Sequence, residues 1–282
     1  FTVTWRNPRA QAPAPADLLR AGERLQRFWL TATRLGLAMQ PSLAPIAFAT
    51  HALTGVRFTA ETDSLNAAIL GPDATPETPE FDAFVKAVFV EITSKAGQKC
   101  TAIRRVIVPQ DRVEDVVAAV AERVQQRVVI GDPRTEGVTM GALASKEQQG
   151  EVRKAVERLV AAGGDADTGA GAFFPVTVLS FDDPDTPEVH FVEAFGPVTS
   201  VLGYTDVDDA VRLAALGGGS LVATVCTNDG ATAARFTAGI GSHPGRVHVL
   251  NRQAAKTSTG HGSPMPHLVH GGPGRAGGGE EL

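Results

Sequence analysis

Short β-branched runs alternate with amphipathic helical patterns along most of this chain, and this alternation limits the possible fold more than any other feature. The runs have the apolar composition and the flanking turn residues of buried strands. Strands that alternate with helices favour a mostly parallel sheet covered by helices on both faces. The sequence therefore predicts an α/β fold. The expected strands are 105–109, 176–179, 198–202, 221–226 and 247–250.

A helix is expected before the first of these strands. Phe81, Phe84, Val88 and Ile92 recur at spacings of three and four residues, so they line one helix face, and Gly97 ends the pattern.

Two further helices are expected from capping residues. Asp111 as N-cap, with Glu114 three residues later, predicts a helix with a buried row of valines. Ser145 with Gln148 predicts a second capping box, and Gly163 ends that helix. The valines of the first helix are Val113, Val116, Val117, Val120 and Val124.

Charge and cysteine content exclude several classes of protein. The 282 residues carry 26 Lys and Arg against 31 Asp and Glu, a net charge of −5, which argues against a broadly basic nucleic-acid or membrane-surface protein. Two cysteines are too few for a disulfide scaffold or a four-cysteine zinc site. No apolar run approaches the length that crosses a bilayer. We therefore expect a soluble, cytoplasmic protein that binds neither nucleic acid nor membranes.

The first 51 residues differ in charge from the rest of the chain. They carry six arginines against Asp17 and Glu23, a net charge of +4, which leaves −9 for the remainder. A Pro- and Ala-rich stretch at 8–15 precedes apolar residues at helical spacing over 18–35, so an amphipathic helix is expected. This helix needs a surface to pack on, because helix propensity alone does not stabilise it.

Cys100 has the surroundings that most favour nucleophilic chemistry. It lies between a predicted helix and a predicted strand, beside Lys99 and close in sequence to Arg104 and Arg105. Positive charge favours the thiolate, the reactive form of cysteine. A single free cysteine is more often a small core residue, so the spacing and charge leave both interpretations open. Cys226 lies in an apolar strand and is predicted to be a core residue.

Two acidic residues are further candidates. Glu61 follows a predicted strand end, where a carboxylate could act as a general base or could simply be solvated. Glu193 begins the segment Glu193-Ala-Phe195-Gly-Pro197 before a predicted strand. This segment is either an ordinary turn with an anchoring aromatic residue or a loop that faces a ligand.

The C-terminal tail, 261–282, is predicted to be a loop. Its segment 272–277 matches G-x-G-x-x-G, but a proline interrupts the match and the strand and helix of a dinucleotide fingerprint are not expected around it. His261, His267 and His270 fit no ordinary zinc spacing, so no metal is expected.

Together these segments resemble the catalytic half of an aldehyde dehydrogenase over roughly 56–282. Gly97-Gln-Lys-Cys100-Thr101 is similar to the nucleophile motif of that family, Glu61 to its general base, and 193–197 to its cofactor-ribose loop. Within the family, four segments resemble the dehydrogenase portion of the bifunctional enzymes of bacterial phenylacetate degradation, which oxidises a CoA-linked semialdehyde. These segments are 61–66, 97–105, 258–263 and 270–281.

The resemblance implies a mostly parallel catalytic domain and a two-stage covalent mechanism with NADP or NAD as cofactor. Cys100 is then the nucleophile, and its backbone N–H is one oxyanion donor. Glu61 activates the hydrolytic water, Glu193 holds the nicotinamide ribose, and Phe195 packs near the nicotinamide ring. The implied partner is a small-molecule aldehyde, with a CoA-linked one favoured, and a homo-oligomer stays open.

The resemblance also has limits. Most of the family's nucleotide-binding domain, with a side-chain asparagine that serves as the second oxyanion donor, has no match here, so impaired turnover is expected. Residues 17–41 resemble, over a short stretch, the C-terminal part of a nitroreductase. We therefore predict a helical segment at 1–55 derived from a different protein, followed by a catalytic domain at 56–282 that is truncated at its C-terminus. A remnant without turnover and, more weakly, a flavin reductase are the alternatives.

Overall fold

The computed structural model describes residues 63–166, 173–263 and 270–277. The chain divides into two units, Phe1–Ala60 and Glu61–Leu282, and the description below concerns the second. The helix expected at 18–35, the candidate base Glu61 and the proposed boundary at 55 and 56 lie outside the described residues.

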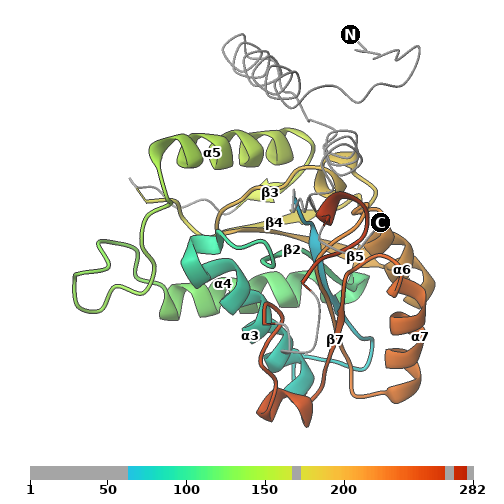
Figure 1. Ribbon diagram of the computed structural model, residues 1–282. Helices are drawn as coiled ribbons and strands as arrows, with labels where there is room; N and C mark the ends of the chain where they lie inside the picture. Colours follow the sequence, from blue (N-terminus) through green and yellow to red (C-terminus); the bar gives the residue numbers. More distant parts are fainter. Residues whose placement is uncertain (1–62, 167–172, 264–269, 278–282) are drawn as a thin grey trace, which may run out of the picture. The chain divides into compact units, whose positions relative to one another are not determined.

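A single sheet of seven strands forms the centre of the second unit (Figure 1). The strand order is β3-β4-β5-β2-β1-β6-β7, and every pairing is parallel except that of β3 with β4. The α/β fold with a mostly parallel sheet is thereby confirmed. The strands are β1 (Asn66–Leu70), β2 (Ile103–Pro109), β3 (Asp165–Ala166), β4 (Thr177–Phe181), β5 (Val198–Tyr204), β6 (Ala223–Cys226) and β7 (Val247–Leu250).

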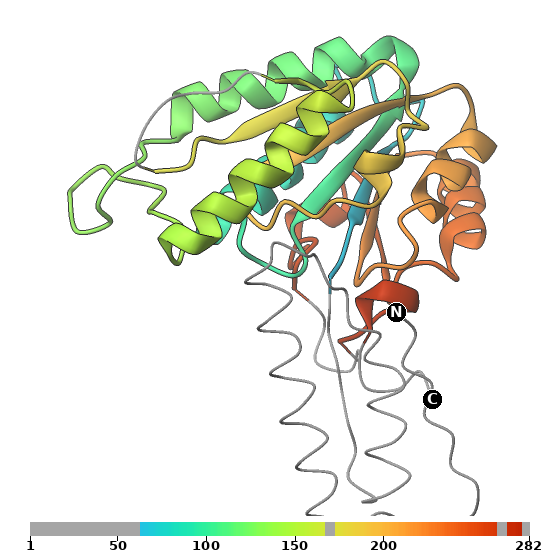
Figure 2. The ribbon, with the colours of Figure 1, turned by 90° about the horizontal axis from the view of Figure 1, so that it is seen from above.

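Helices cover both faces of this sheet (Figures 1 and 2). α3 and α4 pack on one face, and α5, α6 and α7 on the other. The helices are α3 (Pro79–Thr93), α4 (Val113–Arg127), α5 (Lys146–Ala161), α6 (Val207–Ala215) and α7 (Gly230–Ile240). Short 3₁₀ turns are η1 (Ser94–Gly97), η2 (Gln110–Arg112), η3 (Pro187–His190), η4 (Ala254–Lys256) and η5 (Gly274–Ala276).

Alternate residues of each strand enter two separate hydrophobic cores. Ile69 and Ile107 face the layer of α5, α6 and α7, whereas their neighbours Leu70 and Val108 face α3 and α4. Successive side chains of a strand point to opposite faces, so a sheet covered on both sides needs apolar residues at nearly every position. The unbroken burial of β1 and β5 follows from this arrangement.

The five expected strands are all present, with ends that differ by a few residues. One capping prediction is wrong: Asp111 lies inside η2, and α4 begins after Arg112 without a side-chain cap. The valine row is partly confirmed, because Val116 and Val120 are fully buried and the other three are only partly buried.

The second capping prediction is half right. The Ser145 hydroxyl accepts from the Gln148 N–H at 3.1 Å and caps α5. The Gln148 side chain does not close the box and instead donates to the Phe195 carbonyl at 2.9 Å. Gly163 follows the end of α5 with φ +109°, as its role as a stop residue requires.

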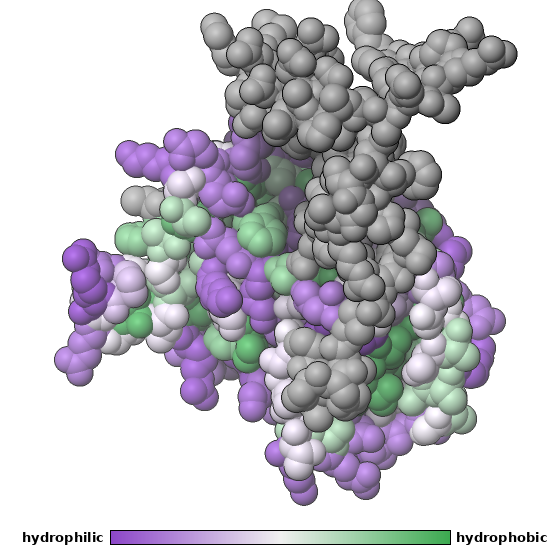
Figure 3. Space-filling view, viewed as in Figure 1, coloured by the Kyte–Doolittle hydropathy of each residue, from purple (hydrophilic) through white to green (hydrophobic). Residues whose placement is uncertain are grey.

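Hydrophilic side chains cover much of the face shown in Figure 3, with smaller apolar patches between them. None of the helices in the described parts of the chain is both long and apolar enough to span a membrane.

Candidate functional site

The candidate site lies at the amino edge of the parallel strands. The loop with Cys100 precedes β2, the segment 193–197 precedes β5, and Ser64 precedes β1. Parallel strands begin at the same edge of a sheet, so these three loops are neighbours. The topology thus brings together segments that lie up to about 130 positions apart in the sequence, as the bond from Ser64 to Glu193 shows.

The loop before Cys100 has an unusual backbone. Lys95, Ala96 and Gly97 have φ values of +53°, +52° and +68°, which place three successive residues in the left-handed region. Such values are costly for residues with a Cβ. At Gly97 a Cβ would also lie 2.1 Å from the Gly196 carbonyl oxygen. The segment before Cys100 therefore needs glycine at position 97, because its backbone touches the 193–197 loop.

Asn66 holds the backbone at Cys100 and just after it. Its side-chain amide donates to the carbonyls of Cys100, at 2.7 Å, and Ala102, at 3.0 Å. Its Oδ1 accepts from the Ser64 hydroxyl at 2.7 Å and from the Val222 N–H at 3.1 Å. All four bonding positions of a buried amide are thereby used. The backbone of the half-buried Cys100 is thereby tied to β1, the strand that begins at Asn66.

Two of the cations that flank Cys100 in the sequence have partners other than its thiol. The Lys99 ammonium pairs with Glu91 at 2.8 Å. The Arg105 guanidinium is buried and donates to the carbonyls of Leu65, Leu213 and Ala214. Lys99 and Arg105 thus have partners of their own, and the expected effect of the flanking cations on the thiol stays a prediction.

Arg246 is a cation, remote in the sequence, whose charge interacts with that of Cys100. Arg246 precedes β7, and its guanidinium donates to the His261 carbonyl at 3.1 Å. Its Nη1 atom is buried without a hydrogen-bond partner among the described residues. Burial lowers the pKa of Arg246, and the charges of Cys100 and Glu91 oppose that shift.

Arg104 connects the two loops of the site. Its guanidinium donates to the carbonyls of Gly97 at 2.7 Å and Gly196 at 2.6 Å. The same group faces the Glu193 carboxylate at 3.5 Å and lies over the Phe195 ring at 5.5 Å. One buried side chain thus contacts Gly97, in the loop before Cys100, and both candidate cofactor residues. From the sequence, Arg104 was noted for its charge near Cys100, and its contacts with the 193–197 loop were not expected.

Glu193 lies beside this arginine, with its side chain 10% exposed. Its Oε2 accepts from the Ser64 N–H at 3.2 Å, whereas its Oε1 has no hydrogen-bond partner in the described part of the chain. Burial raises the pKa of Glu193, although the nearby Arg104 and the bond from Ser64 oppose the shift. Phe195 is 36% exposed at the same loop. The loop therefore presents an acceptor oxygen and an accessible aromatic ring.

The three tail histidines have different surroundings. His270 places its Nε2 3.8 Å from the Cys100 sulfur. His261 is buried and its Nδ1 lies 2.7 Å from the Thr224 hydroxyl, whereas His267 lies outside the described residues. Within the described ranges no three His, Cys, Asp or Glu side chains gather as metal ligands would.

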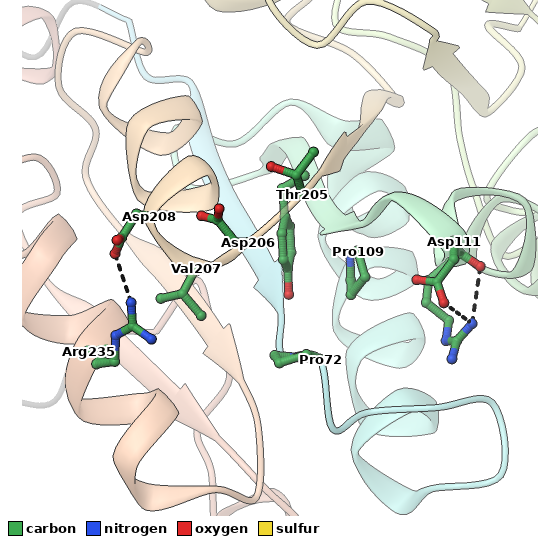
Figure 4. A pocket seen from close by; sticks show the side chains of 10 residues that line it. Pro72, Pro109, Asp111, Thr205, Asp206, Val207, Asp208 and Arg235 are labelled. Atoms are coloured by element: carbon green, nitrogen blue, oxygen red, sulfur yellow. Dashed lines mark hydrogen bonds and ion pairs between the residues drawn. The ribbon is translucent and has the colours of Figure 1, made fainter.

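The opposite, carboxyl edge of the sheet holds a cavity of about 590 Å³ (Figure 4). Its charged side chains pair with one another, Asp208 with Arg235 at 3.0 Å and Asp111 with Arg112 at 2.8 Å. The Tyr204 hydroxyl donates to the Leu70 carbonyl at 2.7 Å. Most of these polar groups have partners within the chain, and the buried Nε of Arg112 is the exception among the described lining atoms.

Comparison with known proteins agrees with this architecture. The model of the aldehyde dehydrogenase family matches residues 46–280. The chain belongs to the aldehyde dehydrogenase family.

Two curated relatives give a finer view. The chain is 43% identical over 234 residues to 3,4-dehydroadipyl-CoA semialdehyde dehydrogenase of Aromatoleum evansii, with 77% of this chain and 45% of that protein covered. It is 52% identical over 151 residues to Protein MaoC of Klebsiella aerogenes, with 51% of this chain and 45% of that protein covered. The chain thus spans less than half the length of these relatives.

Solved structures show the same fold. An NAD-dependent aldehyde dehydrogenase from Sinorhizobium meliloti matches with a TM-score of 0.68 and 25% identity, covering 80% of this chain and 43% of that one. The NADP complex of a glyceraldehyde-3-phosphate dehydrogenase from Bacillus halodurans C-125 matches with a TM-score of 0.67 and 20% identity, covering 83% and 46%. This chain therefore has a partial aldehyde dehydrogenase fold.

Proposed function

We propose that this chain is the catalytic portion of an NAD(P)-dependent aldehyde dehydrogenase that acts on a CoA-linked semialdehyde. The observation that carries the proposal is the Cys100 loop, fixed by Asn66 and tied through Arg104 to the loop of Glu193 and Phe195. The substrate class is suggested by the name of the relative from Aromatoleum evansii.

The residues present fit a nicotinamide cofactor at one point. The buried Oε1 of Glu193, which lacks a hydrogen-bond partner among the described residues, can accept from a ribose hydroxyl. The exposed ring of Phe195 can pack beside the nicotinamide. When bound, the nicotinamide supplies the hydride acceptor for the oxidation. The phenylacetate pathway and the choice of NADP over NAD are expectations from resemblance alone.

The protein groups act in two stages in this proposal. The Cys100 thiolate adds to the aldehyde carbon, and the carbonyl electron pair moves to the oxygen, which the Cys100 N–H stabilises as an oxyanion. Oxidation converts this thiohemiacetal to a thioester on the same sulfur. Glu61 then removes a proton from the water that attacks the thioester carbon. The sulfur leaves as thiolate, and the product is a carboxylic acid.

The test is the formation of reduced nicotinamide from NADP or NAD and a CoA-linked semialdehyde. We expect turnover in the chain to be abolished by Cys100→Ala and retained by Cys226→Ser, since Cys226 is buried in the core. Equal turnover in Cys100→Ala and the unchanged chain would contradict the proposed nucleophile.

A folded domain without turnover is the second candidate. The observation that favours it is that Glu193 and Phe195 are the two described residues proposed to contact the cofactor, and both belong to one loop. This candidate predicts that a well-folded chain forms no reduced nicotinamide although Cys100 still reacts with alkylating agents. Measurable turnover would exclude it.

A further inference from the structure

The tail places a histidine at the nucleophile. His270 follows Cys100 by 170 residues, and its Nε2 lies 3.8 Å from the sulfur, within hydrogen-bonding distance for a thiol. His270 is exposed to solvent and Cys100 is half-buried. The imidazole can therefore exchange protons with water while it contacts the sulfur.

The segment 270–277, which carries His270, packs against the loops that precede β1, β5, β6 and β7. Arg275 pairs with Asp63 and donates to the Phe191 carbonyl at 2.9 Å. The Arg275 N–H donates to the Gly218 carbonyl at 3.1 Å, in the loop before β6. A Cβ on Gly245 would lie 1.7 Å from the Gly271 carbonyl oxygen, which shows how closely the tail packs ahead of β7. The position of His270 is therefore set by several contacts.

The other charged groups around Cys100 are poorly suited to accept its proton. Lys99 is engaged with Glu91. The guanidinium of Arg246, which precedes β7, stays protonated at any ordinary pH and can stabilise negative charge without taking up a proton. His261 is directed to Thr224. Glu61, the proposed base of the second stage, lies outside the described residues.

We propose that His270 is a catalytic residue that accepts the proton of the Cys100 thiol, so that the sulfur attacks as a thiolate held against an imidazolium. This proposal rests on the proposed function, since it assigns a proton acceptor to that nucleophile. The S–H bond breaks and its proton goes to Nε2 of His270. The sulfur electron pair forms the bond to the aldehyde carbon, and the carbonyl electron pair moves to oxygen. The imidazolium returns its proton to solvent.

The proposal divides the proton transfers between two residues. His270 acts before the carbon–sulfur bond forms, and Glu61 acts on water after oxidation. Paired cysteine and histidine side chains are a general way to raise the thiolate fraction near neutral pH.

The test is the rate of alkylation of Cys100 by iodoacetamide from pH 5 to 10, assigned to each cysteine by peptide mass spectrometry. We expect His270→Ala and His270→Gln to move the pH midpoint upward by about one unit and to slow alkylation at pH 7 on the order of tenfold. Cys226 is an internal control, because burial raises its pKa to about 12. His243→Gln, a histidine after α7, is the matched variant and should leave the profile unchanged. Unchanged profiles in both His270 variants would overturn the proposal.

A second measurement uses the unsubstituted chain. The ring of His270 is titrated by NMR before and after alkylation of Cys100. Removal of the thiolate should lower the titration midpoint of this ring by at least about half a pH unit, because the imidazolium loses its counter-charge. An identical midpoint would overturn the pairing. Loss of turnover in Cys100→Ala together with unchanged His270 results would leave the proposed function standing and remove only the proton acceptor.

Discussion

Arg104 shows how much of the site depends on one side chain. Its planar guanidinium has five N–H donors, and it uses them on carbonyls of two loops while its charge faces Glu193. A lysine has a single ammonium at this position and cannot reach the same partners together. The distance between the loop that contains Gly97 and the 193–197 loop is therefore set by the shape of the Arg104 guanidinium.

We expect Arg104→Ala to lower the free energy of unfolding by about 3–5 kcal/mol, since it leaves the Glu193 carboxylate and two carbonyls buried without their partner. Arg104→Lys should also lower the free energy of unfolding, by less than Arg104→Ala does. Urea unfolding followed by circular dichroism measures both. The control is Arg235→Ala, which removes an exposed ion pair with Asp208 and should change stability little. Comparable losses in Arg104→Ala and Arg235→Ala would show that the contacts of Arg104 contribute nothing special.

His190 is a buried neutral histidine beside another buried arginine. Its Nδ1 lies 3.2 Å from Nη1 of Arg105, which can only donate, and its Nε2 therefore carries the hydrogen that reaches the Pro184 carbonyl at 2.7 Å. Burial lowers the pKa of His190 to about 4, and the charge of Arg105 adds to the shift. Burial also lowers the pKa of Arg105, to about 9.

Stability should depend on pH through His190. Between pH 6.5 and 4 the unfolded chain binds a proton at this residue that the folded chain does not bind. The free energy of unfolding therefore falls as the pH falls through this window, by about 3 kcal/mol for the full shift. His190→Gln removes this contribution, so the stabilities of the variant and the unsubstituted chain should converge at low pH. Urea unfolding at pH 4.5, 5.5 and 6.5 tests this prediction. A difference in free energy of unfolding between the two chains that stays the same at all three pH values would contradict it.

At the scale of elements, the sequence predicts strands where β-branched residues are dense. β2, β4, β5, β6 and β7 were expected for that reason. β1 was missed because Asn66-Ala-Ala-Ile-Leu70 begins with an amide and two alanines, which have low strand propensity. Its place in the centre of the sheet comes from burial on both faces, a tertiary effect that a local pattern does not contain.

The helices show the same limit. α3 and α5 were expected from clear apolar spacing or a serine cap. α6 and α7 were not placed individually, since α6 has nine residues and α7 contains glycine at both its first position and its penultimate one. Short or glycine-containing helices depend on packing against their neighbours more than on propensity.

The site could be predicted only in part. Cys100, Glu193 and Phe195 were named from motifs, and the structure places them on two loops that touch. Their roles, and that of Glu61, stay predictions. Arg104 was noted only as a cation near Cys100 and Asn66 only as part of a resembling segment, because the bonds that make both important join parts that are remote in the sequence.

We expect Gly97→Ala to disrupt the contact between the nucleophile loop and the 193–197 loop. The added Cβ would meet the Gly196 carbonyl at 2.1 Å, and alanine also disfavours φ near +68°. The variant should have a lower free energy of unfolding and a changed rate of alkylation at Cys100. Gly150→Ala in α5 is the matched control, since its Cβ meets nothing within 4 Å, and it should be stabilised by about 0.5–1 kcal/mol. A Gly97→Ala chain as stable as the unsubstituted one would contradict the tight contact.

At the scale of the whole second unit, one sheet separates two cores. Phe84 of α3 lies in one core and Phe236 of α7 in the other, and both are fully buried. The strands contribute side chains to both cores in alternation, so neither layer of helices can leave without exposing strand residues to water. The unit should therefore unfold as one body.

Phe84→Ala and Phe236→Ala should each lower the free energy of unfolding by about 3–5 kcal/mol, because each leaves a large cavity. Both variants should still show a single transition, at the same denaturant concentration for near-ultraviolet and far-ultraviolet circular dichroism. Two separated transitions in either variant would show that the layers unfold independently.

The position of the candidate site at the amino edge has an electrical consequence. α3, α4, α6 and α7 each follow a parallel strand, so their C-termini return toward this edge, and α3 ends seven residues before Cys100. The end of a helix dipole at its C-terminus is negative, and its field disfavours a thiolate nearby. α5 runs the other way, so the helix end at this edge is its positive N-terminus. The first turn of α5 lies against Phe195. The negative charge on sulfur must therefore be balanced by side chains such as Arg246, and because Nη1 of Arg246 is buried, added salt should change the reaction rate of this thiol little.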